Sequence, residues 1–254
     1  MRFFLDISFR GACYHGWQRQ PGDMSVQQRL EEAMCAVLKA SVAVTGAGRT
    51  DTGVNARCMP AHFDWPVEET VTAERLEGLR KALNAICRPD IVVNSIRRVA
   101  DDAHARFDAT RRTYRYFVHT EPDPFVYPLS WQAPRGLDFG RMNEAARHLL
   151  GRQDFTSLSK LHTDVKTNIC NVATAEWRPM DADGKRWYFE ISADRFLRNM
   201  VRATVGTLVD VGRGKYAPEH VKEVLAAMDR CAAGTSMPAH ALFLWDVAYP
   251  YEWL

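Results

Sequence analysis

A short glycine-rich segment holds the residues best suited to chemistry. Residues 45–56 read Thr-Gly-Ala-Gly-Arg-Thr-Asp-Thr-Gly-Val-Asn-Ala, which places Arg49 and Asp51 two positions apart. In extended backbone this spacing puts two side chains on the same face. A carboxylate beside a guanidinium stays ionised, and an ionised carboxylate on a rigid turn can act as a nucleophile. A Gly-x-Arg-x-Asp sequence is also compatible with a plain turn closed by an ion pair, so these residues alone leave both interpretations open.

The elements before this segment are predicted from periodicity and turn residues. Residues 2–10 alternate apolar and polar side chains, which predicts a strand with one buried face. Ser25 begins a helix whose apolar side Val26, Leu30 and Met34 share. The β-branched run Val42–Val44 predicts a strand that leads into the glycine-rich turn.

The remainder of the chain alternates strands and helices. The first half continues with a strand at 62–65, a helix that ends near Pro89 and a strand at 91–96. In the second half we expect strands at 113–118, 173–177, 187–191 and 242–249 and helices at 138–150, 195–211 and 218–228. Asp194 is expected to cap the helix at 195–211, the longest of the chain, on which Arg195, Arg198 and Arg202 form a basic stripe.

Length and composition restrict the class of protein. The chain has 254 residues, 46% of them hydrophobic and 25% charged, which is typical of a soluble globular protein with two domains of ordinary size. We expect domains at 1–105 and 106–254. No apolar run is long enough to span a bilayer, and the first residues do not resemble a signal peptide, so a cytoplasmic location is expected.

The six cysteines are scattered without a Cys-x-x-Cys pair. Structural zinc usually needs four ligands at short spacings, so neither a metal site nor a disulfide framework is expected. Free, partly buried thiols are the expectation.

Two segments concentrate positive charge although the formal net charge is only +2. Residues 97–115 carry six arginines against three aspartates, and residues 195–215 carry four arginines and one lysine against one aspartate. Arginine suits phosphate contacts and stacking on bases, which points to nucleic acid as a partner. Ordinary solvated surface is the alternative for either segment taken alone.

Several motifs, taken in order, resemble the signatures of the TruA family of tRNA pseudouridine synthases. The central one is Gly-Arg-Thr-Asp-x-Gly-Val-x-Ala at 48–56, followed by His62-Phe63. The others are Gly-Trp-Gln at 16–18, the block Arg-Phe-x-Ala…Tyr-x-Tyr at 106–116, Asp-Phe-Thr-Ser at 154–157, Met-Val-Arg-x-x-Val-Gly at 200–206 and Pro-Ala-x-Ala-Leu-x-Leu at 238–244. The resemblance covers the chain from Phe9 to Pro250.

The resemblance implies a fold and an activity. The fold is α+β: two similar domains with mainly antiparallel sheets meet at a central RNA-binding cleft, with helices on the outer faces. The activity is isomerisation of uridine to pseudouridine at positions 38, 39 or 40 of the tRNA anticodon stem-loop, by base flipping. The family acts as a homodimer and uses neither cofactor nor metal.

The resemblance also assigns site residues. Asp51 maps to the catalytic nucleophile, Tyr114 to the tyrosine that contacts the uracil ring, and Arg202 to the arginine that pairs with the aspartate. Arg49 is expected to fill the stack that the flipped base leaves. Further RNA contacts are expected from His104, Arg106, Phe107, Arg198 and Lys160. Without the resemblance, Tyr114 and Tyr116 would pass as ordinary strand aromatics, and His62 and Trp17 are expected to have packing roles.

This sequence departs from the family pattern at four positions. Thr52 stands where alanine is common, Asn55 where histidine is usual, Met59 where glutamine is frequent and Ala241 where glycine is frequent. None of these removes the Asp, Arg or Tyr that the chemistry needs. Asn55 is expected to alter hydrogen bonding in the loop, and the others to shift which uridines are preferred.

Two other classes of function are compatible with parts of the sequence. A non-catalytic tRNA-binding or RNA-folding protein would keep the basic segments without needing Asp51. A nucleotide-binding protein would use Gly46-Ala47-Gly48 as a phosphate loop, but such a loop opens a helix and is followed by a Gly-Lys-Ser/Thr sequence that is absent here.

Overall fold

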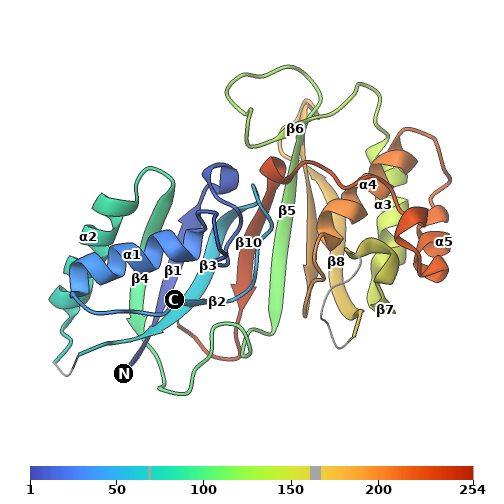
Figure 1. Cartoon of the computed structure of the whole chain (residues 1–254). Coiled ribbons are helices and arrows are strands. Elements are labelled where there is room, and N and C mark those ends of the chain that lie inside the picture. The colour runs from blue at the N-terminus through green and yellow to red at the C-terminus, as the bar shows by residue number, and fades with distance from the viewer. Residues whose placement is uncertain (68–69, 161–166, 254) are drawn as a thin grey trace. The chain divides into compact units, whose positions relative to one another are not determined.

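The computed structural model describes residues 1–67, 70–160 and 167–253 and has an α+β fold (Figure 1). The chain divides into two compact units, one of residues 1–110 and 244–254, the other of residues 111–243. The expected boundary lay at 105/106 and assigned the C-terminal segment to the second unit. That segment groups with the first unit because Tyr249 and Trp253 pack edge-on against Phe4, with ring centroids 5.5 and 5.1 Å away.

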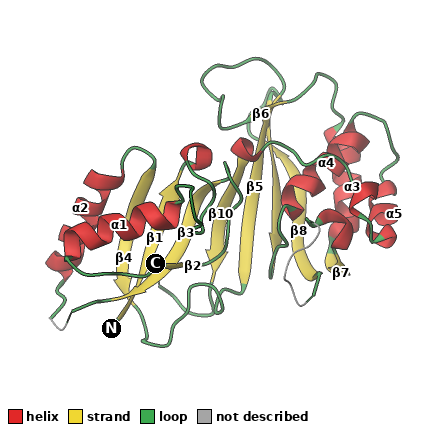
Figure 2. Cartoon of the chain, in the orientation of Figure 1, coloured by secondary structure: helices red, strands yellow, loops and turns green. Residues whose placement is uncertain are grey.

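The first unit contains a sheet in the order β4-β1-β3-β10, with the short β2 beside β3. The pairs β1–β3, β1–β4 and β2–β3 are antiparallel. Helices α1 and α2 contact each other, and α2 contacts β4 (Figure 2). The elements are β1 (Arg2–Phe9), α1 (Val26–Leu38), β2 (Thr45–Gly46), β3 (Asn55–Asp64), α2 (Ala73–Cys87), β4 (Ile91–Arg98) and β10 (Leu242–Ala248), with a 3-10 turn at Gly11–Cys13.

Strand β1 is buried on both faces at its start. Phe3, Leu5 and Ile7 are buried as the alternation predicted. Phe4, on the side expected to be polar, is fully buried as well, in a cluster with Ala103, Ala105 and Trp253. The prediction of a single buried face was therefore wrong here, because distant segments of the chain cover the second face.

The second unit contains a sheet in the order β5-β9-β8-β7, with β6 beside β5. The pairs β5–β9, β8–β9 and β7–β8 are antiparallel, and β6 runs parallel to β5. The elements are β5 (Arg111–His119), β6 (Trp131–Gln132), α3 (Phe139–Ala146), β7 (Gly151–Asp154), β8 (Ile169–Pro179), β9 (Arg186–Ala193), α4 (Met200–Gly212) and α5 (His220–Ala227), with 3-10 turns at Arg147–Leu149, Thr156–Leu158, Arg230–Ala232 and Ala239–Ala241.

Helices α3 and α4 pack on each other, and α3 also packs on β8. Trp177 and Phe189 are fully buried and lie 5.2 Å apart between ring centroids, while Phe139 stacks on Trp187 at 4.1 Å. An aromatic core of this kind fixes where the neighbouring polar side chains lie.

The strand expected at Val42–Val44 is not formed, and only the next two residues pair with β3. The backbone of Val44 bonds instead to side chains of α1: its N–H donates to Glu31 Oε1 at 3.0 Å, and its carbonyl accepts from Gln27 Nε2 at 2.9 Å. Helix side chains thus take the bonds that a strand neighbour would have supplied.

Candidate functional site

The predicted site residues are divided between the two units. Arg49, Asp51, His104, Arg106 and Phe107 belong to the first unit, and Tyr114, Lys160, Arg198 and Arg202 to the second. The predicted pairing of Arg202 with Asp51 joins residues of different units and stays a prediction.

Asp51 begins a tight turn between β2 and β3. Its carbonyl accepts a hydrogen bond from the N–H of Val54 at 3.1 Å, and Gly53, the third residue of the turn, has a φ of +78°, which favours glycine. Thr50 is buried, whereas Arg49 is exposed and Asp51 is half-buried. The charged side chains on either side of Thr50 are therefore less buried than Thr50 itself.

The segment between β1 and α1 holds this turn through backbone contacts. The Trp17 N–H donates to the Thr50 carbonyl at 3.3 Å, and the Gly53 N–H donates to the Tyr14 carbonyl at 3.4 Å. Gly16, with φ +83°, has no room for a side chain, because an added Cβ would lie 2.4 Å from the Thr50 oxygen. The turn that presents Asp51 is therefore fixed from both ends.

Trp17 has the packing role that its sequence context predicted. It is 3% exposed, and its ring lies so close to Gly46 that a Cβ there would come within 2.5 Å. It supports the Asp51 turn from inside, and its burial leaves little of the ring accessible to a ligand.

Asn55 supplies a hydrogen bond that sequence reasoning did not identify. Its Oδ1 accepts from the N–H of Gly11 at 2.9 Å, and the side chain is 2% exposed. An added Cβ on Gly11 would lie 2.2 Å from the Val54 carbonyl oxygen, so the two backbones are in close contact. The sequence signal for this bond was a polar residue at position 55, directly after a glycine-containing turn.

His104, Arg106 and Phe107 form one compact surface feature on the loop between β4 and β5. The His104 Nδ1 accepts from the N–H groups of Arg106 and Phe107 at 3.1 and 3.2 Å. The His104 and Phe107 rings lie 4.3 Å apart between centroids, and the Arg106 guanidinium lies 5.9 Å from the centre of the Phe107 ring. Phe107 is 76% exposed, so this group offers an aromatic and cationic surface to a ligand.

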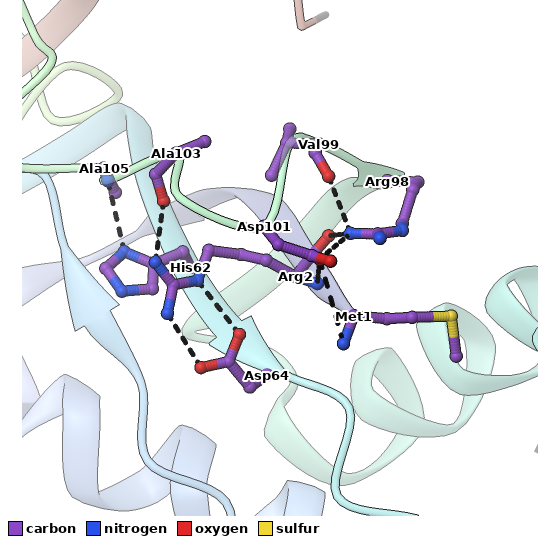
Figure 3. A network of polar contacts seen from close by, with 9 residues as sticks. All are labelled: Met1, Arg2, His62, Asp64, Arg98, Val99, Asp101, Ala103 and Ala105. Carbon is purple, nitrogen blue, oxygen red and sulfur yellow. Dashed lines mark hydrogen bonds and ion pairs between the residues drawn. The ribbon is translucent and has the colours of Figure 1, made fainter. Parts of the chain in front are cut away.

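His62 lies beneath that loop in a network of polar contacts (Figure 3). Its Nδ1 accepts from the Ala105 N–H at 3.1 Å. Burial, then the neighbouring His104 and Arg2, lower the pKa of His62 to about 4. Arg2 binds the Asp64 carboxylate at 2.8 Å and donates to the Ala103 carbonyl at 3.1 Å. His62 is therefore a neutral, buried acceptor.

Tyr114 lies on β5 in the second unit, half-buried, with its ring 5.0 Å from that of Phe196 in an edge-to-face contact. Tyr116, two residues further on, is fully buried, and burial raises the pKa of its hydroxyl. Of this pair, Tyr114 alone retains a surface that a base can contact.

Arg202 lies in the first turn of α4 and is held by a neighbouring segment. Its Nε donates to the Met237 carbonyl at 2.5 Å, and the Met237 N–H donates to the Arg202 carbonyl at 3.1 Å. The same segment crosses α4 closely, because a Cβ on Gly206 would lie 1.8 Å from the Thr235 carbonyl oxygen. The segment around Met237, which is distant in the sequence, therefore fixes the direction of the Arg202 guanidinium.

The predicted helix at 195–211 begins only at Met200, so Arg195 and Arg198 do not share a helical stripe with Arg202. Asn199 adopts a left-handed φ of +66°, and Asp194 does not cap the helix but accepts from the N–H groups of Asn171 and Arg195. The longest described helix is α2, with 15 residues.

Lys160 and Arg198 lie together on the second unit. The Lys160 N–H donates to the Arg198 carbonyl at 2.9 Å, and both residues are exposed. They form a cationic pair suited to phosphate. The expected RNA-contacting loop continues through His162 and Lys166, which lie outside the described residues.

Part of the positive charge counted in the two basic segments is neutralised by ion pairs. Arg98 binds Asp101 at 2.6 Å, Arg115 binds Glu190 at 2.7 Å and Lys215 binds Asp210 at 3.2 Å. Within the described ranges, no group of three or more His, Cys, Asp or Glu side chains could hold a metal ion, and no helix is long and apolar enough to cross a membrane.

Comparisons with known proteins relate this chain to one family. The family model described as tRNA pseudouridine synthase matches residues 145–250. The tRNA pseudouridine synthase A of Bacteroides thetaiotaomicron is 52% identical over 99% of this chain and 91% of that protein, and that of Parabacteroides distasonis is 51% identical over 99% and 97%. The tRNA pseudouridine synthase A of Bacillus subtilis is 41% identical over 98% of this chain and 99% of that protein.

Proposed function

This chain belongs to the tRNA pseudouridine synthase family, and we propose that it isomerises uridine to pseudouridine at position 38, 39 or 40 of the tRNA anticodon stem-loop. The observation that carries the proposal is the turn at Asp51. A rigid, backbone-held turn carries one half-buried carboxylate two residues after an exposed arginine. A reaction that depends on attack by a carboxylate needs that kind of fixed placement.

In the proposed reaction Asp51 is the nucleophile. It attacks the uridine, at C6 of the base or at C1′ of the ribose, and the bond between N1 and C1′ breaks. The uracil rotates while bound, a new bond forms between C5 and C1′, and the bond to the Asp51 carboxylate breaks. The hydrogen at C5 leaves as a proton, and N1 takes up a proton. No atom is gained or lost overall, so the reaction needs no oxidant or reductant.

The target base must leave the helical stack before this chemistry. Flipping a base costs a few kcal/mol, which contacts in the active site must offset. In this proposal Arg49, which is exposed and lies two residues before Asp51, occupies the vacated stack and contacts the RNA backbone. Tyr114 holds the uracil with its ring, supported by Phe196, and its hydroxyl assists removal of the C5 proton.

Arg202 keeps Asp51 ionised in this proposal. A carboxylate that loses solvent when RNA binds needs a nearby cation to stay charged. The contacts of Arg202 with Met237 support the role, because they limit the positions that its guanidinium can take.

The remaining candidates contact the RNA outside the reacting base. His104, Arg106 and Phe107 offer the aromatic and cationic surface described above, and Lys160 and Arg198 offer cations for phosphates. As the family resemblance implies, the enzyme acts in the cytoplasm as a homodimer without cofactor or metal. Light scattering coupled to gel filtration tests the dimer.

Tritium release tests the reaction. The substrate is an unmodified tRNA with C5-tritiated uridine, and forming the new C5 bond must expel the label. We expect release by the wild type, none by Asp51→Asn, and tRNA affinity of that variant near wild type, because the amide preserves shape while removing the nucleophilic charge. Substantial release by Asp51→Asn would remove Asp51 from its role. Tight binding with no release by either protein would favour a non-catalytic tRNA-binding or folding protein.

A further inference from the structure

Phe107 combines an exposed side chain with a firmly held backbone. Its ring is 76% exposed, yet the loop that carries it is bonded at both ends. The Val99 N–H donates to the Arg2 carbonyl at 3.1 Å, and the Thr110 N–H donates to the Ala248 carbonyl at 2.9 Å. Because the backbone is already held, a flat ligand that stacks on this ring would not have to order the loop first.

The turn around Phe107 is closed by His104 and Asp108. The Asp108 N–H donates to the His104 carbonyl at 3.1 Å, and the His104 N–H donates to Asp108 Oδ2 at 2.7 Å. The Tyr251 hydroxyl donates to the same carboxylate oxygen at 2.8 Å. The turn therefore has little freedom apart from the side chains of Arg106 and Phe107.

Three rings follow one another from the sheet to the surface. The His62 ring lies 4.6 Å from that of His104, which lies 4.3 Å from that of Phe107. The innermost member, His62, is 7% exposed. It also fixes Ala105, whose N–H donates to His62 Nδ1 at 3.1 Å and whose carbonyl accepts from the Tyr249 hydroxyl at 2.5 Å.

We propose that His62 is a positioning residue for RNA binding, which fixes Ala105 through Nδ1 and backs the His104 ring so that Phe107 is held ready to stack on an unpaired nucleobase. The proposal rests on the proposed function for the choice of RNA. Arg106 beside the Phe107 ring favours a nucleic acid over an apolar protein partner, because a base stacks on the ring while the guanidinium meets phosphate or the base face.

The charged and titratable groups around His62 keep it in the form that this role needs. Arg2 approaches from β1, Asp64 from β3, and His104 and Asp108 from the loop. Burial lowers the pKa of His62 to about 4, with smaller contributions from the neighbouring His104 and Arg2. Its Nδ1 lone pair is therefore available at neutral pH. Figure 3 shows this acceptor facing Ala105, with Arg2 bound to Asp64 and to the Ala103 carbonyl.

A double-mutant cycle on binding of an unmodified tRNA transcript tests the proposal with the full chain. Phe107→Ala is expected to weaken binding roughly 5- to 150-fold, as loss of one stacked base does. His62→Leu is expected to weaken it to a similar extent in the wild type and not further in the Phe107→Ala background. His62→Asn is expected to restore binding, because the amide oxygen lies as many bonds from the backbone as Nδ1.

Turnover separates positioning from catalysis. Phe107→Ala and His62→Leu are both expected to raise KM, while kcat at saturating tRNA stays within about twofold of the wild-type value. The reason is that the stacked base is bound equally in the substrate complex and the transition state. Phe125→Ala is the matched control, because Phe125 is 95% exposed in the second unit and is expected to leave binding unchanged. His62→Gln, with its amide one bond further out, is a second loss variant should His62→Leu fold poorly.

Equal losses from His62→Leu in both backgrounds would overturn the proposal and leave His62 a purely structural residue. Unchanged binding by Phe107→Ala would overturn the stacking role. Failure of the proposed function would give a different result. The wild type would release no tritium from the transcript, while the binding assay would still measure the coupling free energy between positions 62 and 107.

Discussion

The side-chain oxygen of Asn55 accepts a hydrogen bond from the backbone N–H of Gly11 at 2.9 Å, and it is buried. This bond joins the loop after β1 to the strand that follows the Asp51 turn. Histidine is the residue usually expected at position 55 in the family. Asn55 therefore fixes the turn through this bond, and how the bonding differs from that of a histidine stays a prediction.

Asn55→Ala should destabilise the protein and lower turnover. The Gly11 N–H would remain buried without an acceptor, which costs about 1–3 kcal/mol. Urea unfolding measures this loss, and tritium release measures the effect on turnover. Ser8→Ala is the control, because the Ser8 hydroxyl donates to the Arg57 carbonyl and accepts from Asn94 Nδ2 in exposed bonds that water can replace. Its loss should change stability by less than about 0.5 kcal/mol. Equal effects of the two substitutions would contradict the role of Asn55.

Arg202→Gln should lower kcat strongly, by about 10²-fold or more, because Asp51 would lose the cation that keeps it charged in the complex. In an Asp51→Asn background it should have no further effect, since no carboxylate remains to stabilise. Single-turnover kinetics on tRNA measure the first variant, and tRNA binding compares both backgrounds. Arg198→Gln is the comparison, because this exposed side chain is expected to affect KM rather than kcat. An unchanged kcat for Arg202→Gln would contradict the proposed pairing of Arg202 with Asp51.

Stability should fall in mild acid because of His62. Histidine in an unfolded chain titrates near 6.5, whereas burial and the neighbours of His62 hold its pKa at about 4 in the folded state. Below pH 6.5 the unfolded chain binds the extra proton first, so the stabilisation is complete above that pH and is lost as the pH falls toward 4. The contribution of this group to the free energy of unfolding should be about 2 kcal/mol smaller at pH 5 than at pH 7.

The matched variant for this experiment is His62→Asn, which keeps the acceptor but does not titrate. His119, His148 and His240 also have pKa values lowered by burial, so they lower stability in acid in the same direction. The difference between wild type and variant isolates His62. Identical pH dependence in the two proteins would assign the effect to the other three histidines.

The six cysteines, all free, should fall into two classes. Cys13, Cys35 and Cys231 are exposed, whereas burial raises the pKa of the Cys58, Cys87 and Cys170 thiols, the last to about 12. Because the thiolate is the reactive form, an aromatic disulfide reagent at pH 7 should titrate three thiols quickly in the folded protein and six after unfolding. Fast reaction of more than three thiols would contradict the assignment of Cys58, Cys87 and Cys170 to the slowly reacting class.

Local signals in the sequence were enough to predict most of the elements. The Ser25 side chain accepts from the Gln28 N–H and begins α1, as its position before an apolar helical face predicted. The Asp138 side chain likewise caps α3 by accepting from the Arg141 N–H, at the start of the helix expected at 138–150. Strands β8 and β9 contain the strands expected at 173–177 and 187–191. The start of α4 was predicted wrongly. Neither the left-handed backbone of Asn199 nor the bond from the distant Asn171 N–H to Asp194 changes the apolar periodicity of the sequence.

The sequence by itself determined the types of residue available for chemistry and their order, from the Asp51 turn through Tyr114 to Arg202. Only the tertiary structure decided what holds the Asp51 turn, the Phe107 loop and Arg202. The Gly11 N–H bonds to Asn55, the Ala105 N–H bonds to His62, and Arg202 bonds to the Met237 carbonyl. The physical reason is the range of the interactions. Caps, turns and apolar periodicity act between residues a few positions apart, whereas these bonds join residues 44, 43 and 35 positions apart that meet only when the sheets and helices of each unit pack.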